Sequence, residues 1–270
     1  MNSIEYQKMF QVEEDHWWYA SLHEQILGYL QNYLNSESLP NSQTLFLDAA
    51  CGTGGLLQKL RSLVQGRRNF ISVGVDFSQR ALFFSHERQL RNLLQSDVSL
   101  LPFPPETFDF ITAMDVLCQV EVDEQKSLQE FYRVLKPEGI LLLQVPAFEF
   151  LKSEHDLAVH VGRRYTRKKL YQLLEKERFK AHHLFYRNTL LFPVALIWRL
   201  LKKSSWRTER TADKVASDVI PLPKAINEFL KGILKFESFL IRRFIQFPFG
   251  LSLFCVAKKE KCDIYESYSF

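Results

Sequence analysis

Uninterrupted apolar runs alternate with amphipathic stretches along the first half of the chain, and this alternation predicts strands that alternate with helices. Four apolar runs, at 44–48, 70–76, 108–114 and 140–145, have the length of buried strands. Helices are expected at 3–34, 56–64, 79–94, 124–135 and 166–177, the third capped by Ser78 and the last by Thr166. Because a parallel strand pair needs a long crossover, this order predicts a doubly wound parallel sheet with helices on both faces.

The C-terminal third has a different pattern. Residues 180–188 and 250–258 resemble strands, whereas 190–245 are mostly helical with a break at Pro221 and Pro223. Two strands separated by a helical excursion predict an antiparallel edge that carries an insertion. The expected organisation is an N-terminal helical cap at 1–44, a core formed by 45–188 and 249–260, and a helical insertion at 189–248.

The first predicted strand runs into a glycine-rich turn, LFLDAACGTGG, whose spacing limits the ligand. A phosphate-binding P-loop needs a lysine that this turn does not have, and the dinucleotide fingerprint G-x-G-x-x-G would place its third glycine at Leu57. The order found is D-x-A-x-G-x-G, from Asp48 to Gly54. Glycine lets a ligand approach the backbone closely, and the acid suits a cationic ligand better than a pyrophosphate.

Further segments follow in order: VGVDFS with Asp76, QSDVSLLPF with Asp97, then FDFITAMDVL and VLKPEGILLL. Together they resemble the class I S-adenosylmethionine-dependent methyltransferases over about 45–150, although Ala50 stands where a glycine is usual. The resemblance implies an α/β fold with a Rossmann-like, doubly wound, mostly parallel seven-stranded sheet, an antiparallel C-terminal edge and a helical insertion.

The same resemblance implies that the cofactor is S-adenosyl-L-methionine and that the product is S-adenosyl-L-homocysteine. Asp76 is expected to accept hydrogen bonds from the ribose hydroxyls, and Asp97 from the adenine amino group. The expected cofactor-binding residues are Asp48, Ala49, Ala50, Cys51, Gly52, Gly54, Asp76, Phe77, Asp97, Val98, Met114 and Asp115.

Two more segments, EEDHWWY and HDLAVHVGRRYT, resemble a bacterial subgroup of these enzymes. His155 lies just past the fourth predicted strand, so we expect it to be a general base that Asp156 orients. The alternative is a structural histidine that caps a helix. Cys118 and Gln119 stand where Glu-His is common in relatives, so no catalytic role is expected for that pair.

An aromatic and cationic set is expected to bind the acceptor. Its members are Trp17, Trp18, Phe148, His160, Arg163 and Tyr165. For the tryptophans, the alternative is packing of the N-terminal helix on the sheet. For Arg163, the alternative is a salt bridge that orders the loop. His155, Asp156 and His160 lack a fourth ligand, so no metal is expected.

The charge of the chain is unevenly distributed. The net charge is +4, but residues 1–156 carry 12 Lys and Arg against 21 Asp and Glu, whereas 157–261 carry 23 against 8. A basic C-terminal half can face an anionic acceptor, a membrane or nucleic acid, or it can be a solvated helix face. The apolar and basic stretches within 189–248 predict a helical cap, an interfacial helix or a dimer contact.

Other features exclude some classes. The N-terminus is polar and acidic, unlike a signal peptide, and the longest apolar stretch, 189–201, is too short to span a bilayer. The four cysteines form no C-x-x-C pair, which favours reduced thiols and a cytoplasmic location. The loop that leaves the predicted strand at 108–114 reads MDVL. This is not a signature of base methylation, so no nucleic-acid partner is expected.

We therefore expect a methyltransferase that acts on an oxygen or nitrogen atom of a small, partly apolar acceptor of the secondary-metabolite type. A lipid-linked or sugar acceptor at a membrane surface is the first alternative, with peripheral contact through 189–248. A cofactor-binding scaffold without turnover is the second alternative. The sequence leaves open whether the protein is a monomer or a homodimer.

Overall fold

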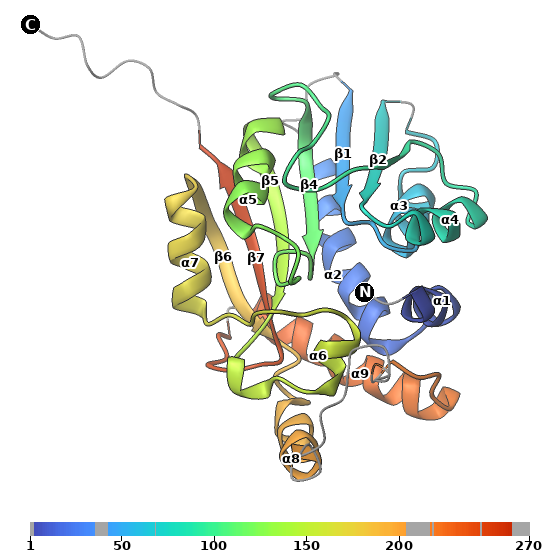
Figure 1. Ribbon diagram of the computed structural model, residues 1–270, viewed down its shortest axis with the longest axis vertical. Coiled ribbons are helices and arrows are strands. Elements are labelled where there is room, and N and C mark those ends of the chain that lie inside the picture. The colour runs from blue at the N-terminus through green and yellow to red at the C-terminus, as the bar shows by residue number, and fades with distance from the viewer. Residues whose placement is uncertain are drawn as a thin grey trace, which may run out of the picture.

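The computed structural model describes residues 3–35, 43–67, 69–203, 217, 219–243 and 245–260. This part of the chain forms a seven-stranded sheet in the order β3-β2-β1-β4-β5-β7-β6 (Figure 1). The strands are β1 (Thr44–Ala49), β2 (Phe70–Asp76), β3 (Leu93–Gln95), β4 (Phe108–Met114), β5 (Leu135–Pro146), β6 (Phe179–Arg187) and β7 (Ser252–Lys259). β1 to β5 pair in parallel, and β7 lies antiparallel between β5 and β6. The expected fold class is confirmed.

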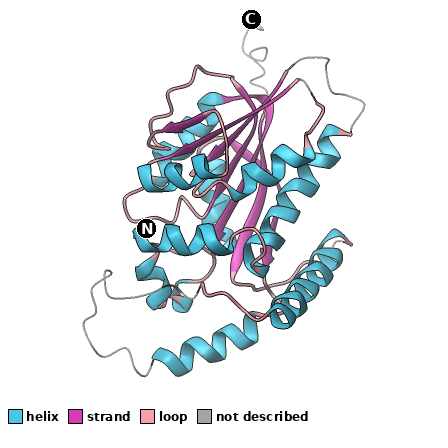
Figure 2. Cartoon of the chain, turned by 90° about the vertical axis from the view of Figure 1, so that its right-hand side faces the viewer, coloured by secondary structure: helices cyan, strands magenta, loops and turns pink. Residues whose placement is uncertain are grey.

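Helices cover both faces of this sheet (Figure 2). They are α1 (Ser3–Val12), α2 (Trp17–Leu34), α3 (Gly55–Leu63), α4 (Gln79–Glu87), α5 (Glu124–Val134), α6 (Glu154–Ala158), α7 (Arg167–Lys176), α8 (Phe192–Lys203) and α9 (Lys224–Arg242). Apolar side chains of α5 and α7 pack on one face, and those of α2, α3 and α4 pack on the other. Among the described residues, we find no helix whose length and apolar character would let it cross a bilayer.

One predicted helix was too long. Ser78 does cap α4, because its hydroxyl accepts a hydrogen bond from the backbone N–H of Ala81 at 3.3 Å. The helix ends at Glu87 rather than near residue 94, since Gln89 and Asn92 have φ values of +57° and +56°. The short strand β3, which the apolar pattern did not locate, follows and pairs with β2.

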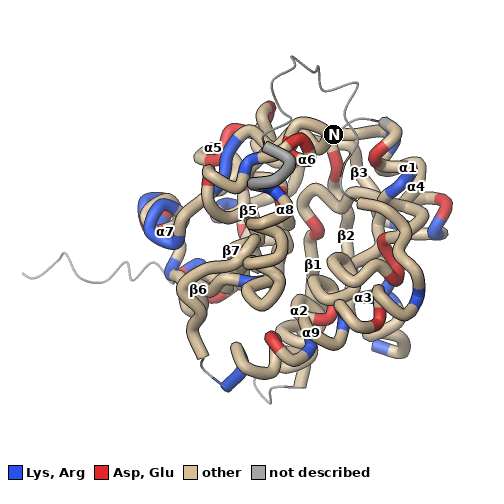
Figure 3. Tube along the Cα trace, turned by 90° about the horizontal axis from the view of Figure 1, so that it is seen from below, with Lys and Arg blue, Asp and Glu red and all other residues tan. Residues whose placement is uncertain are grey.

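The order of the strands creates a switch point between β1 and β4, beyond whose carboxyl ends a ligand site is expected. α1, α6, α8 and α9 gather beyond this edge (Figure 1). α9 runs along α2, and the Asn227 side chain accepts a hydrogen bond from the Trp17 backbone N–H at 2.8 Å. In the view toward the carboxyl ends of the parallel strands, the basic residues of α7 lie on the side of β6, away from α1 (Figure 3).

Candidate cofactor and acceptor site

The glycine turn after β1 has a backbone that few residues can adopt. Ala50, Gly52 and Gly54 have φ values of +67°, +57° and +81°, and α3 begins at Gly55. A Cβ atom on Gly54 would lie 2.5 Å from a methyl group of Leu90, so this position has no room for a side chain. The motif therefore reflects a tight strand-to-helix turn, with Ala50 as its one non-glycine residue at positive φ.

Asp76, at the end of β2, holds this turn in place. One carboxylate oxygen accepts a hydrogen bond from the Gly52 N–H at 2.9 Å, and the other accepts from the Ser78 N–H at 2.9 Å. Burial raises the pKa of Asp76, and the two backbone N–H groups partly offset this effect. Each oxygen keeps a second lone pair, so the carboxylate can still receive two hydroxyl donors from a ribose.

Asp48 lies beneath the turn and is almost fully enclosed. Burial raises the pKa of its carboxyl group to about 7, against the hydrogen bond from the Thr112 hydroxyl at 2.7 Å. The negative charges of Glu13 and Asp76 raise it further. A cationic ligand group at this place, such as the ammonium group of an amino acid, would favour the ionised form of Asp48.

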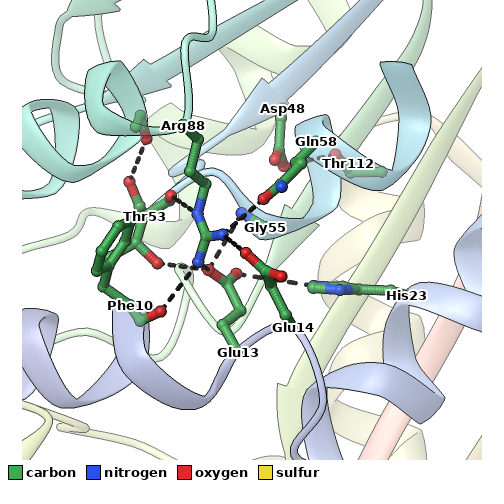
Figure 4. A network of polar contacts seen from close by, with 12 residues as sticks. Phe10, Glu13, Glu14, His23, Asp48, Thr53, Gly55, Gln58, Arg88 and Thr112 are labelled. Atoms are coloured by element: carbon green, nitrogen blue, oxygen red, sulfur yellow. Dashed lines mark hydrogen bonds and ion pairs between the residues drawn. The ribbon is translucent and has the colours of Figure 1, made fainter. Parts of the chain in front are cut away.

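A buried network that the sequence did not reveal fastens the N-terminal segment to the same turn (Figure 4). Glu13, just after α1, accepts hydrogen bonds from the Thr53 hydroxyl and from the Gly55 N–H at 3.1 Å. Arg88 donates to the Thr53 carbonyl at 2.8 Å and to the Phe10 carbonyl at 3.1 Å, and it forms an ion pair with Glu14. These contacts join segments 30 or more residues apart in sequence, so no local pattern predicts them.

The adenine side of the expected site combines an acid with exposed apolar side chains. Phe77 is 74% exposed and Leu100 is 76% exposed, whereas Val98 is buried. Asp97 is exposed, and one of its oxygens accepts hydrogen bonds from the Ser99 N–H and hydroxyl, both at 2.8 Å. Gln95 donates to the Phe77 carbonyl at 3.0 Å and so links the two loops. This arrangement can receive a planar base with an amino group.

A second buried chain of polar contacts extends from β4 toward β6. Gln144 donates to the Asp115 carboxylate at 2.8 Å and accepts from the Arg187 guanidinium at 2.5 Å. Arg187 also donates to the Ser21 hydroxyl of α2 at 2.9 Å. Burial lowers the pKa of Arg187 to about 10, partly offset by the charges of Glu237 and Asp115. Arg187 as a whole is 4% exposed, and the side chains that accept hydrogen bonds from its guanidinium, Gln144 and Ser21, are neutral.

Asp156 forms hydrogen bonds and an ion pair with residues of its own loop. One carboxylate oxygen accepts from the Ser153 N–H at 2.6 Å and completes a capping box at the start of α6. The other forms a buried ion pair with Arg164 at 2.7 Å. These contacts show that Asp156 holds the loop in place, and its predicted part in orienting His155 stays a prediction. The role of His155, which is partly buried on α6, stays a prediction.

Three residues that are expected at the acceptor site hold the loop that leaves β4. Tyr165 is fully buried, and its hydroxyl donates to the Leu117 carbonyl at 3.1 Å. Arg163 donates to the Gln119 and Val122 carbonyls at 2.8 and 2.6 Å. The His160 carbonyl accepts from the Val120 N–H at 3.0 Å. Loop packing thus explains why these residues are adjacent in one motif, and an acceptor contact by His160, Arg163 or Tyr165 stays a prediction.

The aromatic residues expected at the acceptor site bring three segments together. Trp18 and Phe148 pack on a small cluster formed by Leu151, Phe192 and Leu251. Phe148 also stacks on Tyr186, with ring centroids 5.1 Å apart. The N-terminal helix, the loop after β5 and the insertion therefore share one aromatic wall. An acceptor contact by Trp17, Trp18 or Phe148 stays a prediction.

The described residues also include thiols and side chains of metal-binding types. Cys51, Cys118 and Cys255 are free and buried, and burial raises the pKa of each thiol. Cys262 lies outside the described residues. Within the described ranges, no three His, Cys, Asp or Glu side chains form a group that could hold a metal ion.

Comparison with known proteins gives the same picture of the core. Residues 47–143 match the family model described as a methyltransferase domain. The Pseudoalteromonas translucida ubiquinone/menaquinone biosynthesis C-methyltransferase UbiE is 38% identical over 119 residues. That match covers 41% of this chain and 44% of the relative, so it spans less than half of either protein.

Two solved structures share the fold. The Haemonchus contortus phosphoethanolamine N-methyltransferase 2 with S-adenosyl-L-methionine aligns with a TM-score of 0.53 and 18% identity, over 88% of this chain and 53% of that one. The Streptomyces coelicolor geranyl diphosphate C-methyltransferase with S-adenosyl-L-homocysteine aligns with a TM-score of 0.53 and 15% identity, over 86% and 78%. Residues 47–143 are therefore similar to a methyltransferase domain, and the sheet of this chain has the fold that these two methyltransferases share.

Proposed function

We propose that this protein transfers a methyl group from S-adenosyl-L-methionine to a small, partly apolar acceptor. The observation that carries the proposal is the positive-φ glycine turn, tied to Asp76 and underlain by the buried Asp48, within the matched methyltransferase domain. This turn offers close backbone approach, a bidentate carboxylate and a negative charge, which a ribose and an ammonium group require.

Each part of the cofactor has a proposed partner. Asp76 would accept from the ribose hydroxyls, and Asp97 from the adenine amino group beside the exposed rings and chains of Phe77 and Leu100. Asp48 would balance the ammonium charge of the methionyl part. The backbone and small side chains of Ala49, Ala50, Cys51, Gly52 and Gly54, together with Val98, Met114 and Asp115, would complete the contact surface.

The chain's own contribution to the chemistry is mainly positioning. The cofactor supplies an activated methyl group, so aligning the acceptor can provide most of the acceleration. An acceptor that must lose a proton needs a base, and we propose His155 for this step. We propose that the buried Arg187 stabilises negative charge on the acceptor, because its own hydrogen-bond partners are neutral.

We infer the class of the acceptor from the aromatic wall around Trp18 and Phe148 and from the guanidinium of Arg187. A ring or chain that packs on Phe148 and Trp18 and carries an acidic hydroxyl would fit both features. The sequence led us to expect methylation of an oxygen or nitrogen atom. Two of the similar proteins are named C-methyltransferases, so we add a carbon atom as a candidate acceptor. A secondary metabolite of this kind is our first candidate, and a lipid-linked acceptor is the second because apolar side chains of the insertion are exposed.

We further propose a cytoplasmic enzyme whose segment 189–248 makes peripheral membrane contact. The partner is a small molecule, with no nucleic acid. The monomeric or homodimeric state follows from the mass of the protein in solution, measured by light scattering over a range of concentrations.

The test is transfer of a labelled methyl group to a panel of phenols, hydroquinones with and without prenyl tails, amines and sugars. We expect labelled product from at least one apolar hydroxyl-bearing acceptor, with none from Asp76→Ala. His155→Ala should slow transfer without changing cofactor affinity, and equal loss of both would make His155 structural. Tight cofactor binding without transfer to any acceptor would contradict the proposal and favour a scaffold.

A further inference from the structure

Exposed apolar side chains are concentrated in the insertion. More than half of the large apolar side chains that the described part of the chain leaves exposed lie between residues 190 and 249. On α9, Phe229 is 68% exposed and Phe236 is 56% exposed. Phe239 and Ile226, on the same helix, are about half exposed. Clusters of exposed apolar side chains of this kind mark interaction surfaces more often than scattered ones do.

α9 has two faces with different partners. Its inner face is buried and bonded: Asn227 contacts the start of α2, and Glu237 accepts from the Asn188 and Leu190 N–H groups at 2.6 and 2.9 Å. Phe229, Gly232, Phe236 and Phe239 recur at intervals of three and four residues and form what we call the outer stripe. A Cβ atom on Gly232 would meet nothing within 4 Å, so the middle of the stripe is open.

Cations border the outer stripe at both ends. Lys224 stands at the N-terminal end of α9, and Arg242 and Arg243 stand at its C-terminal end, all three exposed. The Arg243 guanidinium lies 5.0 Å from the ring centroid of Phe239, and Lys235 on the flank pairs with Glu24 at 3.5 Å. An exposed apolar stripe with cations at its borders has the composition of a helix that lies in the plane of an anionic membrane surface.

A second copy of the chain fits the same stripe less well. An antiparallel pairing of two α9 helices would bring Lys224 of one copy against Arg242 and Arg243 of the other. A parallel pairing would bring the arginines of both copies together. Like charges at the ends of the contact oppose either arrangement, whereas lipid phosphates would neutralise them.

We propose that the outer stripe of α9 docks the protein on membranes that contain anionic lipid. The helix lies along the surface, with the phenylalanine rings at the boundary between headgroups and acyl chains and the terminal cations on the phosphates. The inner face of the same helix holds the backbone just after Arg187, so docking brings the acceptor end of the site next to the lipid. Docking does not depend on methyl transfer.

The test is flotation of the full-length protein with two kinds of vesicle, phosphatidylcholine alone and phosphatidylcholine with phosphatidylglycerol. We expect binding to the anionic vesicles that weakens with added salt. Phe229→Ser/Phe236→Ser should weaken it at least tenfold, because two exposed rings no longer enter the interface. Phe83→Ser, on α4 and of comparable exposure, is the matched control and should bind like the unchanged protein.

A second pair of variants tests the charges. Lys224→Glu/Arg243→Glu should lose binding to anionic vesicles, with thermal unfolding unchanged because both side chains are exposed. The docking proposal is overturned if the protein binds no vesicle, binds neutral vesicles equally well, or binds equally in the double serine variant. It is also overturned if that variant only turns a dimer into a monomer. Methyl transfer to a water-soluble acceptor, measured on the same variants, separates this result from failure of the proposed function.

Discussion

Replacement of Asp48 by asparagine should stabilise the cofactor-free protein while weakening cofactor binding. Burial raises the pKa of the carboxyl group in the folded protein to about 7, from the 3.8 that is ordinary for an aspartate in an unfolded chain. The folded state therefore holds the proton more tightly, and ionisation of Asp48 lowers stability increasingly as the pH rises from about 4 through about 7. Asparagine keeps the shape and can still accept from Thr112, but it carries no charge.

The size of the effect follows from the two pKa values. Their difference corresponds to a gain for Asp48→Asn of about 4 kcal/mol in the free energy of unfolding at pH 8.5. At pH 5 the unchanged protein already holds the proton in the folded state, and the gain falls to about 2 kcal/mol. The gain is thus pH-dependent, and the affinity for the cationic cofactor should fall because the counter-charge is absent.

Urea unfolding of both proteins without cofactor, at pH 5 and pH 8.5, measures this difference. Comparing the two proteins at each pH removes the contributions of those titratable groups that do not interact with Asp48. Asp97→Asn, an exposed carboxylate at the same edge of the sheet, is the control and should change stability by less than about 0.5 kcal/mol. A gain that is equal at the two pH values, or a loss of stability at pH 8.5, would refute the reasoning.

Three further substitutions test separate parts of the site. Arg187→Met should lower kcat/KM for the acceptor at least tenfold with cofactor Kd unchanged in calorimetry; an equal change in both would make Arg187 structural. Arg164→Met should lower the free energy of unfolding by about 3–5 kcal/mol, because Asp156 keeps a buried charge without its partner, and a loss below about 1 kcal/mol in urea titration would contradict this. Gly55→Ala would place a Cβ atom 2.3 Å from the Glu13 carboxyl carbon and should cost about 1–3 kcal/mol; an unchanged Tm would show that the N-terminal segment does not lie over the turn.

The parts of the fold that could be predicted are those whose signal is local. β1, β2 and β4 are continuous apolar runs because both faces of a parallel sheet are covered, and the glycine turn follows directly from the backbone that it must adopt. β3 escaped prediction because it is a three-residue edge strand whose side chains are partly exposed, so it leaves no apolar run. Its sequence therefore extended the apparent helix that precedes it.

Only those parts of the candidate site that consist of a single continuous segment could be predicted from the sequence. The acids at the carboxyl ends of β1 and β2, Asp48 and Asp76, could be placed from the order of strands alone. Arg88 and Arg187 could not, because their partners come from segments distant in the chain and become neighbours only on folding. Tyr165 and Arg163 belong to a prominent motif, but the motif alone did not show that their side chains hydrogen-bond to carbonyl groups of the loop after β4.

The most direct test of the central claim is calorimetry of the full-length protein with S-adenosyl-L-methionine, S-adenosyl-L-homocysteine and NAD, beside Asp76→Ala. The carboxylate that holds the Gly52 N–H is also the proposed ribose acceptor, so its removal should abolish binding of the first two ligands. We expect micromolar affinity for both by the unchanged protein and none for NAD. Binding of NAD alone, or unchanged affinity in Asp76→Ala, would contradict the assignment of the glycine turn.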